Sequence, residues 1–190
     1  MIVQLTKEKK EKIFRFAKQL LEQPNITVRI LAEFIGTIIS SFPASMHGPL
    51  HFRNLEKQKI ACLIQNNWDY DSKLTLNVTS KSDIAWWSEN ILKMYKPINL
   101  TPFKHTLFCD ASTTGWGAVL KGKKVGGNWA PEMKALHINT LELKAIFFAL
   151  NAFKKYLLAS HVKVYSDNQT AICAINKKGT SHSESCNSIA

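Results

Sequence analysis

Apolar residues in the first half of the chain recur at the spacing of one helix face. In the segment 6–21 this stripe includes Ile13, Ala17 and Leu20, and lysines occupy the opposite face. The same kind of pattern predicts further helices over residues 27–40, 52–66 and 80–94. We therefore expect residues 1–100 to form a mainly helical segment.

Short motifs mark the expected limits of these helices. Thr27 is placed to cap the second helix, and Ser80 with Asp83 has the spacing of a capping box for the fourth. Pro97 and Pro102 bracket a short connector beyond the last helix. We take this connector as the boundary between two domains.

The hydrophobic period changes beyond the connector. Short or alternating apolar runs predict strands over residues 106–109, 116–120, 125–130 and 161–166. Helical periodicity predicts helices over residues 139–158 and 169–177, with Gly179 at the C′ position of the second. The order strand, strand, strand, helix, strand, helix is typical of an α/β layer fold with a mixed sheet.

Three carboxylates stand where these elements begin or end. Asp110 ends the first strand, Asp167 ends the fourth, and Glu142 lies in the first turn of the long helix. If the two strands are parallel neighbours, both aspartates emerge at the edge of the sheet where α/β folds place ligands. Glu142 falls on the apolar face of its helix, where a glutamate that needs only water would not be.

Each carboxylate also has a purely structural explanation. Asp110 could open a turn, and Glu142 could form a capping box with Asn139. Asp167 with Asn168 could cap the following helix. Taken together, however, three converging acids destabilise a fold unless a cation offsets their charge. Ligands that are all oxygen favour Mg²⁺, with Mn²⁺ as the alternative, over zinc.

Composition and charge indicate the class of partner. The chain has 190 residues, 45% of them hydrophobic, with 25 basic and 14 acidic residues and a net charge of +11. A wholly disordered chain is excluded, and a polyanionic partner is favoured, with nucleic acid ahead of membrane. No apolar run reaches the ~18 residues of a membrane span, and no secretory signal is evident. The scattered cysteines suggest an intracellular, reducing location, in the cytoplasm or nucleus.

Three strings carry the carboxylates: FCDASTTGWGAVL, INTLELKAI and VYSDNQTAI. Together, over about residues 104–180, they resemble the ribonuclease H domains of retroelement reverse transcriptases, the DIRS-like group above all. The resemblance implies that Asp110, Glu142 and Asp167 are three of the four carboxylates that bind two Mg²⁺ ions. It also implies a domain over 104–190 that is incomplete at its C-terminus, because the fourth carboxylate should follow a further strand. Glu184 is a weak substitute for it.

The first half resembles the thumb and connection segment that precedes this domain in reverse transcriptases. The residues that carry this resemblance are TVRILAEFIGTIISSFPA, GPLHFRNLEKQK and the pair Trp86 and Trp87. No YxDD string of a polymerase palm occurs, so we do not expect DNA synthesis by this chain alone. The resemblance implies a chain that works within a retrotransposon reverse transcriptase polyprotein, in an oligomeric state that the sequence leaves open.

Five further residues are candidates for contacts with nucleic acid. Gly115 and Gly117 flank Trp116 in the second strand, where glycine would allow close approach of a nucleic-acid backbone. Ser112 and Asn168 could donate hydrogen bonds to phosphate or to a ribose 2′-hydroxyl. Tight packing, a turn and a helix cap are the structural alternatives.

The resemblance to ribonuclease H domains implies Mg²⁺-dependent endonucleolytic hydrolysis of the RNA strand of an RNA–DNA hybrid. An inactive fragment that only binds nucleic acid is the main alternative. A proofreading exonuclease is disfavoured because it usually has an acid two residues after the first aspartate, where this chain has Ser112. An integrase is disfavoured because its glutamate is normally the last of the three acids along the chain, whereas Glu142 comes second. A helical interaction protein would show no stabilisation by Mg²⁺.

Overall fold

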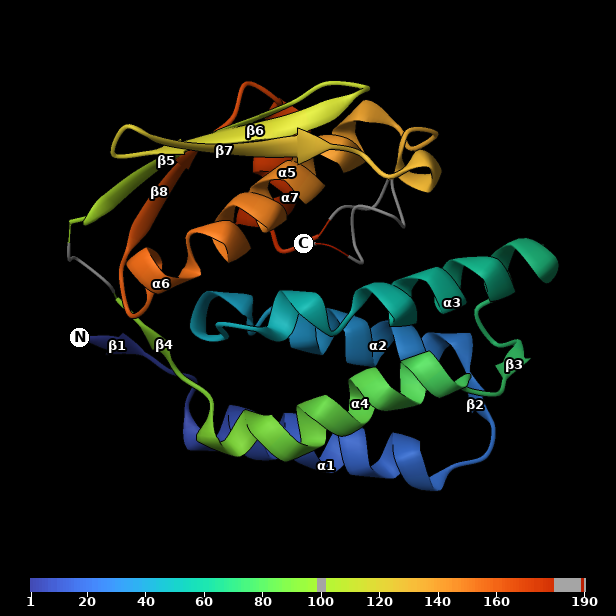
Figure 1. The fold of residues 1–190 in the computed structure, drawn as a ribbon. Coiled ribbons are helices and arrows are strands. Elements are labelled where there is room, and N and C mark those ends of the chain that lie inside the picture. Colours follow the sequence, from blue (N-terminus) through green and yellow to red (C-terminus); the bar gives the residue numbers. More distant parts are fainter. Residues whose placement is uncertain (99–101, 180–188, 190) are drawn as a thin grey trace. The chain divides into compact units, whose positions relative to one another are not determined.

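The computed structural model describes residues 1–98, 102–179 and 189. The chain divides into two compact units, Met1–Asn99 and Leu100–Ala190 (Figure 1). The first unit is mainly helical and the second is α/β. Among the described residues, no helix is both long enough and apolar enough to cross a membrane.

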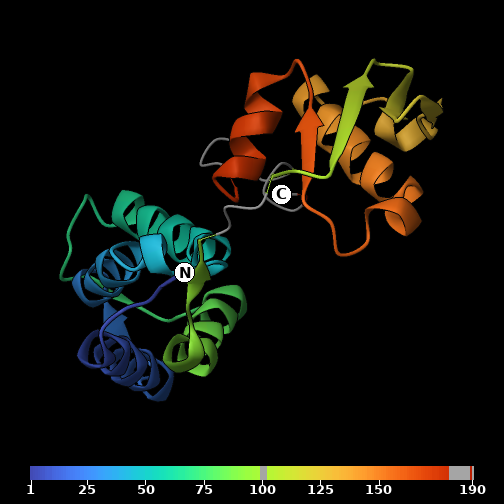
Figure 2. The same ribbon diagram turned by 90° about the vertical axis from the view of Figure 1, so that its left-hand side faces the viewer.

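Four α-helices form the body of the first unit within residues 1–98, and Figure 2 shows them packed side by side. They are α1 (Lys7–Glu22), α2 (Val28–Ile39), α3 (Arg53–Gln65) and α4 (Val78–Asn90). The 3₁₀ turns η1 (Phe42–Ala44), η2 (Gly48–Leu50) and η3 (Ile91–Lys93) connect or extend them. Strand β1 (Ile2–Val3) pairs with β4 (Lys96–Pro97), and β2 (Ile26–Thr27) pairs with β3 (Lys73–Leu74).

The apolar stripe of α1 is buried as its spacing predicts. Ile13, Ala17 and Leu20 are fully buried, and they belong to one core cluster with residues of α2, α3 and α4. Thr27 caps α2, since its hydroxyl accepts the backbone N–H of Ile30 at 3.3 Å. Both predictions are confirmed.

The predicted capping box of α4 is wrong. The helix begins at Val78, and Asn77 is its cap, because the Asn77 side chain accepts the N–H of Ser80 at 2.8 Å. Asp83 therefore lies more than one turn inside the helix. It is buried there and accepts a hydrogen bond from the side-chain amide of Asn54 on α3 at 3.0 Å.

Trp87 lies at the centre of the first unit and fixes the loop that contains η2. Its ring is fully buried, and its indole N–H donates to the backbone carbonyl of His51 at 2.7 Å. Gly48 packs directly under the ring: a Cβ atom there would lie 2.6 Å from Trp87 and closer still to the hydroxyl of Ser45. No larger residue fits without displacing one of them.

The second unit contains a mixed sheet, as predicted for an α/β fold. Its strands are β5 (His105–Ala111), β6 (Gly115–Leu120), β7 (Lys123–Asn128) and β8 (Val162–Tyr165). Within the described residues their order is β7–β6–β5–β8. Strand β6 pairs with β5 and with β7 in antiparallel fashion, and β8 pairs with β5 in parallel.

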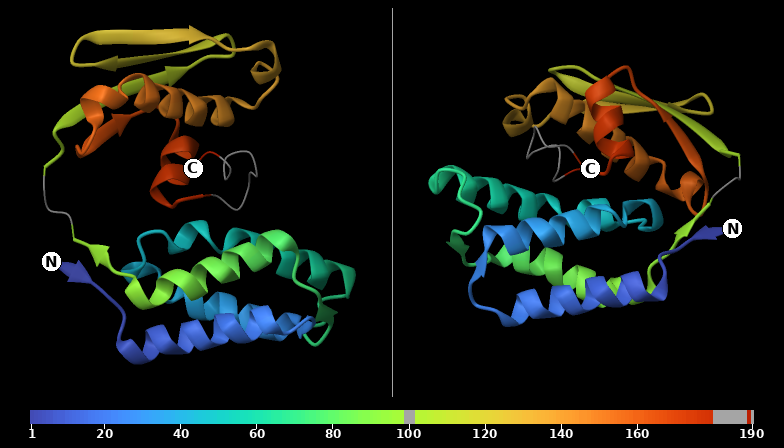
Figure 3. Two further views of the ribbon diagram at one scale, coloured as in Figure 1. Left: turned by 60° about the horizontal axis from the view of Figure 1, so that its bottom comes forward. Right: turned by 180° about the vertical axis from the view of Figure 1, so that it is seen from behind.

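Helices cover one face of this sheet (Figure 3). They are α5 (Ile138–Ala152), α6 (Lys154–Leu157) and α7 (Gln169–Asn176), and η4 (Pro131–Met133) precedes them. The core between helices and sheet contains Leu107 and Leu120 from the strands, Ile146 from α5, and Ala171 and Ala174 from α7.

Two details of the predicted helices are wrong. The helix expected over 139–158 is interrupted at Phe153, which caps α5 with φ −95° and ψ 10° before α6 begins. After α7, the left-handed C′ residue is Lys178, with φ 54°, rather than Gly179. Gly179 is one position further on, and its N–H bonds to the carbonyl of Ala174 at 2.7 Å, as in a Schellman motif.

Candidate metal centre

The parallel pairing of β5 with β8 brings two aspartates to the same edge of the sheet. The last residues in register are Phe108 and Tyr165. Asp110 lies two residues beyond Phe108, and Asp167 lies two residues beyond Tyr165. Because parallel strands end on the same side of a sheet, their side chains emerge close together.

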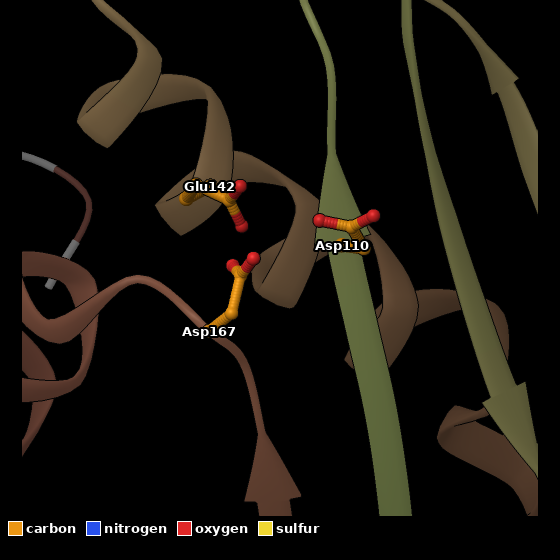
Figure 4. A group of neighbouring side chains, drawn as sticks. All are labelled: Asp110, Glu142 and Asp167. Carbon is orange, nitrogen blue, oxygen red and sulfur yellow. The ribbon is translucent and has the colours of Figure 1, made fainter.

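Glu142 joins them from the helix layer. It lies on the face of α5 that packs against the sheet and is only 3% exposed. Figure 4 shows its carboxylate turned toward that of Asp167, with Asp110 beside them on β5. One carboxylate oxygen from each of the three residues lies within 4.8 Å of the others. The structure thus brings together all three acids of the predicted cluster.

Residues near the three acids, rather than the acids themselves, form the turn and the helix caps that were the alternative explanations for them. Ser112 closes the turn after β5, since its hydroxyl accepts two backbone N–H groups at 3.1 and 3.2 Å. Helix α5 is capped by the ring of His137, not by a box between Asn139 and Glu142. The side chain of Asn168 caps α7 by accepting a backbone N–H at 2.9 Å. These capping and turn roles therefore do not account for the three carboxylates.

The surroundings of Glu142 disfavour its charged form. Burial raises the pKa of its carboxyl group most, and the negative charges of Asp110 and Asp167 raise it further. The backbone N–H of Ala111 and the hydroxyl of Ser166 offset part of this rise in pKa. A cation at the cluster would stabilise all three charges, and without one they repel each other.

The donor set fits a hard divalent cation. All three groups are carboxylates, which suit Mg²⁺ and Mn²⁺. Asp110 and Asp167 are exposed, so water or a substrate oxygen can complete the coordination. A hollow of about 480 Å³ on the sheet, lined in part by these aspartates and by Lys124, leaves the cluster open to large ligands. Cys109 lines this hollow too, and burial raises the pKa of its thiol to about 12.

The glycines predicted to approach nucleic acid differ in their surroundings. At Gly115 a Cβ atom would lie 2.6 Å from the carbonyl oxygen of Gly127 on β7, so close strand packing accounts for glycine there. Gly117 pairs with Asp110 across the sheet, and a Cβ atom there would meet nothing within 4 Å. The space beside Asp110 at Gly117 is therefore open.

The other predicted contact residues have structural partners. The ring of Trp116 is half-buried, with its centroid 5.5 Å from that of Phe148. The hydroxyl of Ser112 is engaged in its turn. Asn168 uses its carbonyl oxygen for the cap of α7 and its amide for a hydrogen bond to Asn139.

Sequence reasoning missed the contacts of Ser166 and Asn139 around the cluster. Ser166 hydrogen-bonds Glu142 at 3.5 Å, and Asn139 accepts from Asn168 at 2.9 Å. Ser166 directly precedes Asp167, and Asn139 lies one helical turn before Glu142. Polar residues at these offsets from a suspected ligand were the available signal.

Comparison with known proteins gives a family match over part of the chain. No curated protein matches the chain. One solved structure with some similarity is described as the foamy viral protease-reverse transcriptase dRH in complex with ds DNA, with 15% identity and a TM-score of 0.38. The match covers 87% of this chain and 28% of that one, so the chain spans well under half of that protein's length. Residues 103–186, which include all three carboxylates, match the model of the RNase H-like domain found in reverse transcriptase.

Proposed function

We propose that the second unit hydrolyses the RNA strand of an RNA–DNA hybrid in a reaction that depends on Mg²⁺ or Mn²⁺. The observation that most supports this is the approach of Asp110, Glu142 and Asp167, whose carboxylate oxygens lie within 4.8 Å of one another. The match of this region to the RNase H-like domain of reverse transcriptases supports a nucleic-acid substrate.

The three carboxylates have distinct parts in this proposal. Glu142, fixed by burial against the sheet, would hold the metal ions from the inside. Asp110 and Asp167, both exposed, would hold them on the side that faces the substrate. Two such ions, when bound, activate water and stabilise the oxygen that leaves in phosphodiester cleavage.

The charge of the second unit suits a polyanionic substrate. Residues 101–190 contain 11 lysines and arginines but only five acids, and three of these five form the cluster. The basic surface would bind the phosphate backbone, and the three clustered acids would bind the metal ions. Contacts to the hybrid would come from residues around the cluster: Ser112, Gly115, Trp116, Gly117 and Asn168. Of these, Gly117 has the most open surroundings.

The rest of the assignment is an extension of the same proposal. The first unit would serve as the thumb and connection of a reverse transcriptase encoded by a DIRS-like retrotransposon. The chain would then act inside the cell, next to a polymerase domain. Its sequence strings, rather than its geometry, support this part.

A second function has one observation in its favour. Among the described residues, the group of potential metal ligands has three acids, whereas the resemblance implies four. A site with three carboxylates could bind nucleic acid and metal without turnover. The second candidate is therefore a binding domain that lacks catalysis.

Cleavage of a labelled RNA–DNA hybrid separates the two functions. We expect cleavage by the wild-type chain with Mg²⁺, and a loss of about 1,000-fold in Asp110→Asn, since a lost metal ligand removes several kcal/mol of stabilisation. Glu132→Gln, which neutralises an exposed acid of the same unit outside the cluster, should cleave like the wild type. Equal cleavage by Asp110→Asn would refute the site. Tight hybrid binding without cleavage in Mg²⁺ or Mn²⁺ would establish the binding domain instead.

A further inference from the structure

Asp167 lies on a short loop, whereas Asp110 lies on a strand and Glu142 on a helix. Strand β8 ends at Tyr165, and α7 begins at Gln169, so residues 166–168 lie outside both. The ladder between β5 and β8 also ends at Tyr165. Something other than the sheet must hold this loop in place.

Asn168 ties the loop to α5. Its side-chain amide donates a hydrogen bond of 2.9 Å to the side-chain oxygen of Asn139, which lies 29 residues away in the first turn of α5. Its own side-chain oxygen accepts the N–H of Ala171 at 2.9 Å and so caps α7. One side chain thus joins α5, the loop and α7.

Ser166 provides a second tie on the other side of Asp167. Its hydroxyl lies 3.5 Å from Glu142 Oε2, and it accepts the backbone N–H of Asn168 at 3.2 Å. The first distance is at the limit for a hydrogen bond, so this contact is the weaker of the two ties. Both neighbours of Asp167 are therefore connected to α5, close to Glu142.

These two contacts oppose the electrostatic repulsion among the three carboxylates. Three carboxylates within 4.8 Å repel each other when no cation is present, and Asp167 is the one on a short loop rather than on a strand or helix. Repulsion would move that loop first. A site that must reassemble before binding metal binds it more weakly than one already formed.

We propose that Asn139 and Asn168 are positioning residues: their side-chain hydrogen bond holds the Asp167 loop against α5 and preforms the carboxylate cluster before metal arrives. This inference rests on the metal-binding part of the proposed function. It adds two residues that support the site without touching the metal.

Variants can break this hydrogen bond and leave the helix cap intact. Asn168→Ser keeps a good N-cap for α7 but cannot reach Asn139. Asn139→Ala removes the acceptor, and Asn139→Asp is the conservative control that retains it. The readout is Mn²⁺ affinity of the chain without nucleic acid, measured from the EPR signal of free Mn²⁺.

We expect Asn139→Ala and Asn168→Ser each to weaken Mn²⁺ binding about 10- to 100-fold, as loss of ligand support does elsewhere. The double variant should be no weaker than the stronger single variant, because both remove the same contact. Asn139→Asp should bind at least as tightly as the wild type. In the metal-free protein, hydrogen exchange of residues 166–168 should accelerate in the two single variants, with α7 unchanged.

Three outcomes would overturn the inference. Wild-type Mn²⁺ affinity in both single variants would do so, as would fully additive losses in the double variant. An unchanged rate of hydrogen exchange at residues 166–168 in metal-free Asn139→Ala would show that this hydrogen bond does not hold the loop in place. Failure of the proposed function looks different, because the wild-type chain itself would then bind no Mn²⁺ or, having bound it, would not cleave.

Discussion

Each of the two units buries a carboxylate. Hydrogen-bond donors surround the one in the first unit, whereas other carboxylates surround the one in the second. Asp83 of the first unit is 6% exposed, and Glu142 of the second is 3% exposed. Burial raises the pKa of both carboxyl groups, and it is the largest cause in each case. By burial alone the two acids would look alike.

Their surroundings separate them. Asp83 accepts hydrogen bonds from Asn54 at 3.0 Å and from the ring of His51 at 3.4 Å, and both contacts lower its pKa. Glu142 instead faces Asp110 and Asp167, which raise its pKa beyond the effect of burial. A buried acid with donors around it is a structural link between helices. A buried acid with other acids around it calls for a cation.

The largest effect that tests this comparison is the loss of Asp83. Asp83→Ala leaves the amide of Asn54 and the ring of His51 without their partner, and should destabilise the first unit by about 2–3 kcal/mol. Hydrogen exchange of α4 in increasing urea measures this. Glu89→Ala, an exposed acid of the same helix, is the control and should change little. A stable Asp83→Ala protein would contradict the structural role.

Glu142→Gln should change stability in the opposite direction to Asp83→Ala, and by a smaller amount. Without metal, the neutral side chain ends the repulsion with its two neighbours, and we expect the second unit to gain about 1 kcal/mol in stability. Calorimetry with and without Mn²⁺ tests both halves of the claim, because the metal should stabilise the wild type but not the variant. If Glu142→Gln destabilises the metal-free chain, as Asp83→Ala does, the distinction between the two acids fails.

The smallest expected effect is a dependence on pH. The folded-state pKa of Glu142 is raised, so the folded chain holds this proton to higher pH than the unfolded chain does. Stability of the metal-free second unit should therefore rise as pH falls from 7 through the raised pKa, and level off below the ordinary value of 4.5. Mn²⁺ affinity should fall over the same range, because protons and metal compete. Melting curves and Mn²⁺ titrations at several pH values measure both slopes, which Glu142→Gln should flatten.

Local patterns in the sequence predicted much of this fold. The stripe that includes Ile13 and Leu20 predicted α1, and strand ends predicted the meeting of Asp110 with Asp167. These features repeat at short range, so periodicity and strand polarity are sufficient. The parallel pairing of β5 with β8 also agrees with the order of the elements, because a long helix between two strands favours a parallel pair.

Other features depend on choices that the sequence leaves open. The cap of α4 was expected at Ser80, but the helix begins earlier with Asn77 as its cap, and Asp83 instead accepts a hydrogen bond from Asn54 on α3. His137 caps α5 although histidine is not a favoured N-cap residue. The bond between Asn139 and Asn168 joins residues that are close only in the folded chain, so short-range patterns can single out the two residues but not their pairing.

The contact beneath Trp87 has a consequence for recognising relatives of the first unit. Gly48 cannot be enlarged while Trp87 and Ser45 remain in place. The pair of Gly48 and Trp87 is thus one that substitutions should spare while the two side-chain positions remain packed together.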